Sequence, residues 1–262
     1  MPKNQLAKVQ ELKKVLESDS VRKQFQNALG ENSGGFIASI IDLYNNDDYL
    51  QKCRPQNVVM EALKAATLKL PINKQLGFAY IVPYGNKPEF QLGYKGYVQL
   101  ALRTGKYRHI NADKVYEGEE IKKDKLTGAI EFKGKAESDK VIGYFAYMEL
   151  INGFSKAEYM TKEEIEAHGQ KFSKSYNSNS SAWQTNFDAM AMKTVLRKLL
   201  SKYGIMSTEM ITAFSQETKY SAEEEMQQEI EDKANSETID IEAEEEEDKK
   251  EEPAEPAKPD FE

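Results

Sequence analysis

The stretch GFAYIVPYGNKPEFQLGYKG, residues 77–96, decides how this chain folds. Residues 78–82 are rich in types that favour strands, and residues 90–92 repeat that chemistry beyond a Pro-Tyr-Gly-Asn turn. This order predicts a β-hairpin. After the stretch, the apolar spacing becomes helical and stops at Gly105, a residue type that commonly ends helices. A short helix should therefore follow the hairpin directly.

The region before the hairpin has a helical pattern. Apolar residues recur at helical spacing through residues 4–17, 21–29 and 36–43. Pro55 is placed as the first-turn proline of a fourth helix, and Pro71 lies beyond the end of that helix. We expect a helical N-terminal region.

The region after the hairpin switches to strands and then back to helix. Strand chemistry dominates residues 107–160, where Asn152-Gly153 is a hairpin signal because both residue types tolerate positive φ. Thr161 begins a Thr-x-x-Glu capping box, and one long helix should run from about Trp183 to Tyr203. Its predicted core face is Phe187, Met190, Ala191, Val195 and Leu199. The fold class is α+β: a mostly antiparallel sheet with β-hairpins, flanked by N-terminal helices and a long C-terminal helix, with a disordered acidic tail.

Charge is distributed unevenly along the chain. Residues 1–220 contain 32 Lys and Arg against 25 Asp and Glu, whereas residues 221–262 contain 4 against 19. A segment so acidic and poor in aromatic residues cannot bury enough apolar surface to fold. We expect a helical region at 1–52 that makes subunit contacts, an α+β core at 53–210, and a largely disordered acidic tail at 211–262.

Composition excludes several classes of function. The single cysteine, Cys53, allows no internal disulfide and favours a reducing cytoplasm. No apolar run is long enough to span a bilayer, so we expect no membrane partner. Only His109 and His168 are available for histidine-based metal or nucleophilic chemistry, and no Walker loop occurs, so we expect no cofactor and no metal. The remaining enzyme hypothesis is a metal-dependent DNA nuclease using Asp113, Glu120 and Lys122.

Nucleic-acid binding needs cations for phosphates and flat rings for bases on one surface. Residues 76–108 interleave both kinds of side chain. The rings are Tyr80, Tyr84, Phe90, Tyr94, Tyr97 and Tyr107, and the cations are Lys87, Lys95, Arg103, Lys106 and Arg108, with Lys74 just before this range. The alternative is that the rings build the sheet core and the lysines solvate it.

A second basic region lies near the final helix. Lys193 and Arg197 are four residues apart and share a helical face, with Lys198 beside them. The preceding loop offers Lys171, Ser173 and Lys174, whose cations and hydroxyl can follow a phosphate backbone. The binding hypothesis requires this region and residues 76–108 to form one positively charged channel.

Four blocks of sequence resemble a known family. They are Cys53-Arg54-Pro55 with Val59-Met60-Glu61-Ala62, Gly77-Phe78-Ala79-Tyr80 with Val82-Pro83-Tyr84-Gly85, Phe90-Gln91-Leu92-Gly93-Tyr94-Lys95-Gly96, and Ala191-Met192-Lys193-Thr194-Val195-Leu196-Arg197. Over about residues 1–210 the chain is similar to the RecT branch of the RecT/Red-beta phage recombinases. The resemblance implies a prophage-encoded, ATP-independent protein that is not an enzyme, binds single-stranded DNA and pairs complementary strands as a ring or helical homo-oligomer.

The resemblance also implies partners and site residues. In that family an exonuclease generates the strands, and the C-terminal region contacts the host single-strand DNA binding protein. Carried over by motif, the expected DNA-binding residues are Tyr80, Tyr84, Gln91, Tyr94, Lys95, Lys193, Arg197 and Lys198. The acidic tail lies outside the matched pattern: it either competes with DNA or docks a partner, and an acidic chaperone or scaffold is the third class of function.

Overall fold

The N-terminal part of the chain is helical, as the sequence predicts. The computed structural model describes residues 3–173 and 175–215, with only the backbone described at residues 3–6 and 120. The first elements are α1 (Lys3–Glu17), α2 (Asp19–Leu29), α3 (Ser33–Asn45) and α4 (Pro55–Thr67), with 3-10 turns at Gly30–Asn32 and Leu50–Lys52. Leu12, Phe25 and Ile40 are fully buried between these helices. Because α1 and α2 both pack on α4, the expected boundary at residue 52 separates elements that share one core.

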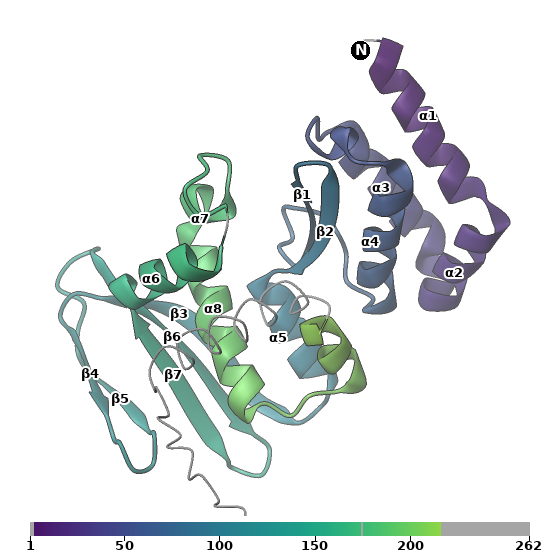
Figure 1. The fold of residues 1–262 in the computed structure, drawn as a ribbon. Helices are drawn as coiled ribbons and strands as arrows, with labels where there is room; N and C mark the ends of the chain where they lie inside the picture. Colours follow the sequence, from purple (N-terminus) through teal and green to yellow (C-terminus); the bar gives the residue numbers. More distant parts are fainter. Residues whose placement is uncertain (1–2, 174, 216–262) are drawn as a thin grey trace, which may run out of the picture. The chain divides into compact units, whose positions relative to one another are not determined.

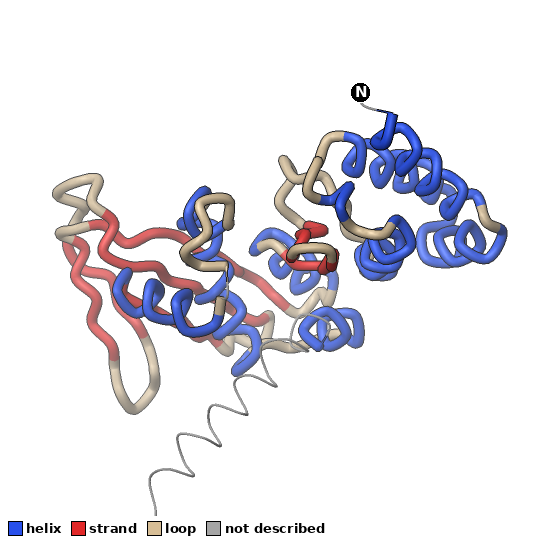
Figure 2. Tube along the Cα trace, turned by 45° about the horizontal axis from the view of Figure 1, so that its top comes forward, coloured by secondary structure: helices blue, strands red, loops and turns tan. Residues whose placement is uncertain are grey.

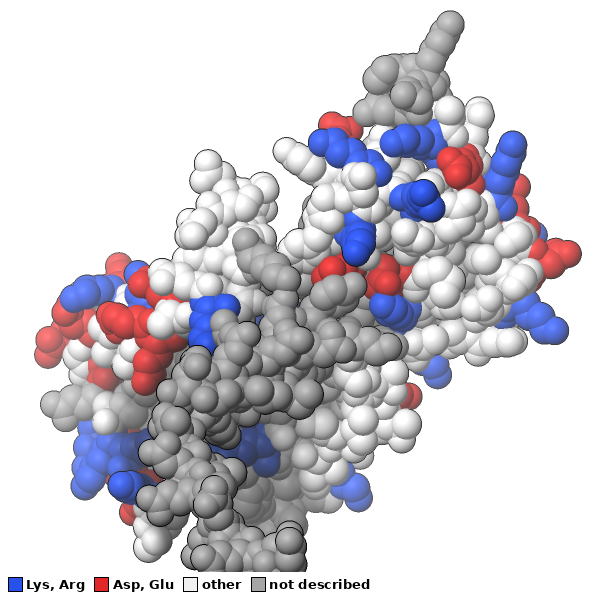
Figure 3. Space-filling view, in the orientation of Figure 1, with Lys and Arg blue, Asp and Glu red and all other residues white. Residues whose placement is uncertain are grey.

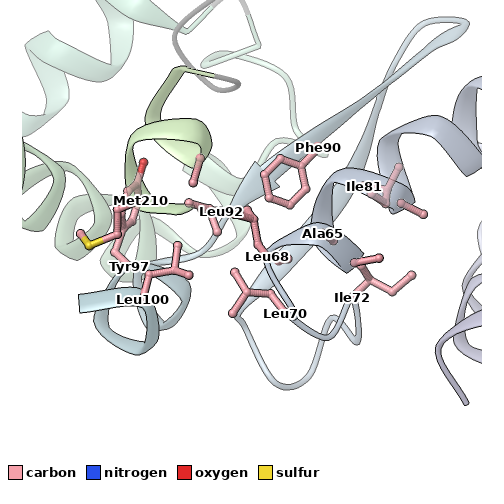
Figure 4. Close-up of a cluster of buried hydrophobic side chains, with 14 of the residues drawn as sticks. Ala65, Leu68, Leu70, Ile72, Ile81, Phe90, Leu92, Tyr97, Leu100 and Met210 are labelled. Atoms are coloured by element: carbon pink, nitrogen blue, oxygen red, sulfur yellow. The ribbon is translucent and has the colours of Figure 1, made fainter. Parts of the chain in front are cut away.

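The predicted hairpin is present and ends in a tighter turn than expected. Strands β1 (Ala79–Tyr84) and β2 (Lys87–Leu92) pair antiparallel, and Tyr84 lies opposite Lys87. Only Gly85 and Asn86 remain in the loop, and Gly85 has a φ of 60° in the left-handed region that favours glycine. The inward face of the hairpin packs on α4 and joins the buried cluster drawn in Figure 4.

A close backbone crossing connects the hairpin to the helix that follows it. Helix α5 (Tyr94–Arg103) begins where the segment 77–78 passes over its first turn, and Gly93 N donates to Phe78 O at 2.9 Å. A Cβ on Gly93 would lie 2.1 Å from Gly77 O, and one on Gly96 would lie 2.2 Å from Phe78 O. No side chain fits at either position, so the glycines of the opening stretch permit this contact.

The strands after α5 form two sheets. Strands β3 (Tyr107–Tyr116), β6 (Val141–Leu150) and β7 (Ser155–Thr161) form an antiparallel sheet in the order β3-β6-β7. Strands β4 (Glu119–Lys123) and β5 (Ile130–Gly134) form a separate hairpin. The loop between β6 and β7 is longer than the predicted Asn-Gly pair and spans residues 151–154, with Gly153 alone at positive φ.

Two helices cover one face of the three-stranded sheet. Helix α6 (Lys162–Phe172) starts at the predicted capping box, in which Thr161 and Glu164 bond each other's backbone amides. Helix α8 (Phe187–Tyr203) lies across the strands, and Figures 1 and 2 show both helices on the same side of the sheet. Tyr144, Ala146 and Met148 are buried beneath them.

The final helix is broken, which corrects the prediction of one helix from Trp183 to Tyr203. Helix α7 (Ala182–Thr185) ends at Asn186, whose φ of −152° and ψ of 57° are not helical. Asp188 explains the restart: its carboxylate accepts hydrogen bonds from Tyr144 Oη and Lys114 Nζ, both at 2.6 Å, which ties the start of α8 to two strands. Burial alone would raise the pKa of Asp188, but the bonds from Lys114 and Tyr144 outweigh it and lower the pKa.

The core of α8 is broader than predicted. Ala191, Val195 and Leu199 are buried, as expected, whereas Phe187 and Met190 are half-buried at its edge. Leu196 and Leu200 are also fully buried, because α8 packs on α5 as well as on the sheet.

The ordered chain continues past residue 210, where the tail was expected to begin. Residues 208–215 are helical, and both Met210 and Ala213 are fully buried. The rest of the expected tail, from residue 216, lies outside the described residues. Within the described chain, no helix is both long and apolar enough to cross a membrane.

The glycine crossing makes a testable prediction. Replacing Gly93 with alanine should lower the free energy of unfolding by about 3 kcal/mol, because the new Cβ meets backbone rather than a movable side chain. The melting temperature should fall by roughly 6–12 °C, measured by thermal unfolding followed by circular dichroism. Gly34→Ala is the matched control: a Cβ there meets nothing within 4 Å, so helix propensity should raise stability by up to about 1 kcal/mol. Equal melting temperatures for the two variants would show that the crossing is not close.

Candidate nucleic-acid interface

The outward face of the β1–β2 hairpin carries three of the predicted site residues. Strand alternation places Tyr80, Tyr84 and Gln91 on this face, while Ile81 and Phe90 point into the core. Tyr80 lies opposite Gln91, and Gln91 Nε2 donates to Tyr84 Oη at 2.7 Å. Tyr84 is 37% exposed. The hairpin therefore presents rings and an amide side by side.

The start of α5 adds the next two predicted residues to this face. Tyr80 Oη lies 3.3 Å, and Lys95 Cδ 3.5 Å, from where a Cβ on Gly77 would stand. Burial raises the pKa of Tyr80, and the nearby Tyr94 hydroxyl raises it further, so the two rings are neighbours. The first turn of α5 contains no acidic residue. Its amide groups and Lys95 together favour an anion at this point.

Half of the rings that the sequence interleaves with cations are core residues. Phe90, Tyr97 and Tyr107 are buried, and Tyr107 Oη donates to Ile205 O at 3.0 Å. Two of the cations are paired: Arg108 with Glu149 at 2.8 Å and Lys74 with Asp47 at 2.6 Å. For these residues the alternative interpretation, that the rings build the core, is correct.

Arg103 and Lys106 lie at the far end of α5. The Arg103 guanidinium donates from Nη1 to Leu68 O at 2.6 Å and from Nη2 to Lys69 O at 2.9 Å. It thereby satisfies carbonyl groups at the end of α4, which is a structural function. Lys106 is exposed, and its carbonyl accepts from the Ile151 amide at 3.0 Å.

Two cations of α8 are held by contacts with other parts of the chain. Lys198 Nζ pairs with Glu158 Oε1 of β7 at 2.7 Å, and Glu158 is buried. The Arg197 guanidinium lies 5.9 Å from the ring centroid of Phe214, whose ring is in turn 5.0 Å from that of Tyr97 on α5. Lys193 is half-buried on the same helix. Packing thus connects α8 to α5 through Phe214.

His168 lies beside these cations, although it was not among the predicted site residues. Burial, together with the nearby charges of Arg197 and Lys198, lowers its pKa to about 4, and burial is the largest cause. Its ring centroid is 4.7 Å from that of Phe172, over which Lys171 Nζ lies at 5.4 Å. Only the four-residue spacing of His168 and Phe172 on α6 is visible in the sequence. Their proximity to α8 arises from the tertiary fold.

Tyr176 anchors the described part of the loop after α6. Tyr176 O accepts from Gln184 Nε2 at 2.8 Å, and the Tyr176 ring lies 5.5 Å from that of Trp183. Trp183 is buried. Ser173 ends α6 with its Oγ 3.4 Å from Ser175 Oγ, whereas Lys174 lies outside the described residues.

Nine of the predicted residues therefore fall into two groups. One consists of Tyr80, Tyr84, Gln91, Tyr94 and Lys95 at the hairpin and the start of α5. The other consists of Lys171, Lys193, Arg197 and Lys198, with His168 added. That the two groups form one continuous channel stays a prediction.

The residues of the nuclease hypothesis lie on different sheets. Asp113 is on β3, where its Oδ1 accepts from the Lys114 amide at 2.8 Å, and Lys122 is on β4. The side chain of Glu120 lies outside the description. Among the described side chains, no group of three His, Cys, Asp or Glu residues could hold a metal ion.

Comparison with known proteins places these residues in a wider context. A model of the RecT family matches residues 34–239. The uncharacterized protein YqaK of Bacillus subtilis (strain 168) is 54% identical over 207 residues, which cover 79% of this chain and 72% of that protein. Protein RecT of Escherichia coli (strain K12) is 32% identical over 183 residues, which cover 65% of this chain and 65% of that protein. The family match includes the hairpin, α5 and α8.

The environment of His168 predicts how stability depends on pH. Its pKa of about 4 lies below the ordinary value of 6.5, so the unfolded chain binds the proton more tightly. His168 therefore contributes stability above its ordinary pKa, and this contribution is lost as the pH falls toward 4. Urea unfolding should show that His168→Gln loses less stability than the wild type as the pH falls through that window. The control is His109→Gln, which replaces an exposed histidine and should follow the wild-type profile. Identical pH profiles for His168→Gln and the wild type would contradict the assigned environment.

Proposed function

Because the chain belongs to the RecT family, we propose that it binds single-stranded DNA and pairs complementary strands without ATP. Family membership supports DNA binding and single-strand annealing in recombination as the general function. The finer proposal is that the chain acts as a ring or helical homo-oligomer, with no catalytic centre, and holds both a single strand and the annealed duplex intermediate.

One observation carries the proposal: the outward face of the hairpin and the start of α5 combine rings with a cation. Tyr80, Tyr84 and Tyr94 offer flat apolar faces, and Lys95 stands beside them at a helix N-terminus. Rings interleaved with cations bind single strands without reading sequence, because every base has a flat face and every nucleotide a phosphate. Gln91 can donate to sugar or phosphate oxygen atoms.

The mechanism follows from electrostatics. Two strands repel each other through their phosphates, so a protein that pairs them must screen that charge while leaving base edges accessible. Lys95 and the cations of α8 are our candidates for screening. Base pairing and stacking then supply the driving force, at roughly 1.4 kcal/mol per step. No nucleotide hydrolysis is needed.

Oligomerisation strengthens weak contacts along a strand. Subunits arranged in a row bind one DNA molecule at many points, and each contact raises the effective concentration of the next. The helices of residues 3–52 are our candidates for subunit contacts, because exposed residues such as Tyr49 border them. A partner exonuclease and a host single-strand DNA binding protein are proposed to act with this chain, the latter through the C-terminal region.

The test is DNA binding and annealing by variants of the two groups. Lys95→Gln should reduce the salt dependence of single-strand binding, the slope of log K against log salt, by about 0.7, because one phosphate contact is lost. Tyr84→Leu should weaken binding by about 1–3 kcal/mol per stacked base with no change in slope. Fluorescence anisotropy with a labelled oligonucleotide measures both effects, and pairing of two complementary strands without ATP measures annealing.

Lys162→Gln is the matched charge control for these variants. Lys162 is exposed in the first turn of α6, beside Glu163 and Glu164, where a phosphate is disfavoured. This variant should bind and anneal like the wild type. If Lys95→Gln and Lys162→Gln change the slope equally, or if the wild type cleaves the strand in magnesium, the proposal is wrong.

A further inference from the structure

The β4–β5 hairpin has an unusually well-braced tip. Asp124 Oδ1 accepts from the amides of Leu126 and Thr127, both at 2.8 Å. The Asp124 backbone completes the turn, with its carbonyl accepting from Gly128 N at 2.8 Å and its amide donating to Ala129 O at 2.9 Å. The aspartate carboxylate is therefore used within the turn, and the tip is held in one conformation.

The hairpin is also fixed to the rest of the protein. The ring of Phe132 packs edge-on against Phe145 of β6, with centroids 4.8 Å apart. The Glu119 carboxylate accepts from the Tyr116 amide at 2.7 Å, and the Lys156 ammonium donates to the Thr127 carbonyl. A projection braced at both ends loses little entropy when it binds a partner.

The exposed tip is basic. Lys122, Lys123 and Lys125 are all exposed, and Figure 3 shows Lys and Arg side chains gathered where this hairpin lies. No salt bridge joins these three ammonium groups to an acid among the described side chains. Glu131 stands opposite Lys122 in the register, and its nearest cation is Lys133 at 3.8 Å.

An apolar side chain stands among these cations. Leu126 is 95% exposed, more than any other large hydrophobic residue of the described chain. Residues 122–127 include no aromatic side chain, and the Phe132 ring already packs against Phe145. The tip thus lacks the stacking surfaces that single strands require. Lysines around a projecting leucine instead fit a surface with phosphates on both sides of an apolar recess.

A duplex groove has this form. The major groove admits a two-stranded β-ribbon, and apolar side chains contact thymine methyl groups there, whereas from the minor groove apolar side chains enter between base steps. Strands of five residues extend about 16 Å, which exceeds the groove depth of about 8.5 Å. We propose that the β4–β5 hairpin is a second nucleic-acid contact, in which Leu126 enters a groove of the annealed duplex while Lys122, Lys123 and Lys125 bind the flanking phosphates. This inference rests on the proposed function in one respect: the duplex that the hairpin binds is the product of annealing.

The experiment compares duplex and single-strand binding by the full-length protein. The triple variant Lys122→Gln, Lys123→Gln, Lys125→Gln should lower the salt slope for a fluorescent duplex by up to about 2.7, with the slope for the single strand unchanged. The matched control replaces the same three lysines with arginine, which keeps the charge and should retain the duplex slope. Leu126→Gln should weaken duplex binding without changing the slope. Melting temperatures near the wild-type value establish that each variant folds.

The outcomes separate this inference from the proposed function. Loss of duplex slope in the glutamine variant and its retention in the arginine variant support the hairpin site, whether or not strands are annealed. Equal losses on single strand and duplex overturn the assignment to duplex. If the glutamine variant binds duplex like the wild type, the hairpin is not a duplex site. The same conclusion follows if this variant loses only self-association, measured by sedimentation, or only binding to phosphatidylserine vesicles.

Discussion

The fold depends on one backbone contact, the passage of residues 77–78 across the first turn of α5. Gly93 donates to Phe78 O at 2.9 Å, and the missing side chains of Gly93 and Gly96 let the two segments meet. This contact sets the position of the hairpin relative to α5, which in turn packs on α8. Tyr80 and Lys95 converge around Gly77 for the same reason. The proposed DNA-binding face is a consequence of that crossing.

A second set of polar contacts fixes the cationic helix. Asp188 ties the start of α8 to Lys114 and Tyr144, and the buried Glu158 pairs with Lys198. Removing one partner of such a pair leaves a buried charge unpaired, and this destabilises the fold by more than the intact pair stabilises it. These carboxylates also reduce the net charge of α8, so phosphate binding at Lys198 would compete with Glu158. Under the proposed function, phosphate binding at Lys198 and the stability of the helix would depend on the same contact.

The sequence predicts the helices and strands well, but it predicts the contacts between them poorly. Period-two alternation locates the hairpin, and the capping box at Thr161 and first-turn proline at Pro55 locate helix starts, because these signals are local. Alternation also separates Phe90 from Gln91, yet the sequence analysis expected the Phe90 ring and the Gln91 amide on the same binding surface. The break at Asn186 has no local breaker and depends on Asp188 reaching two strands. His168 beside Arg197 and Lys198 is likewise a long-range result of packing.

The most direct test of this account is amide hydrogen exchange at Gly93, measured by NMR in the free protein. If the crossing is part of the core, the Gly93 amide exchanges only when the whole domain unfolds, with the same opening free energy as buried amides of α4. Exchange at the rate of an exposed loop amide, while α4 stays protected, would contradict the account. In that case the hairpin and α5 would move independently, and Tyr80 and Lys95 would not form one surface.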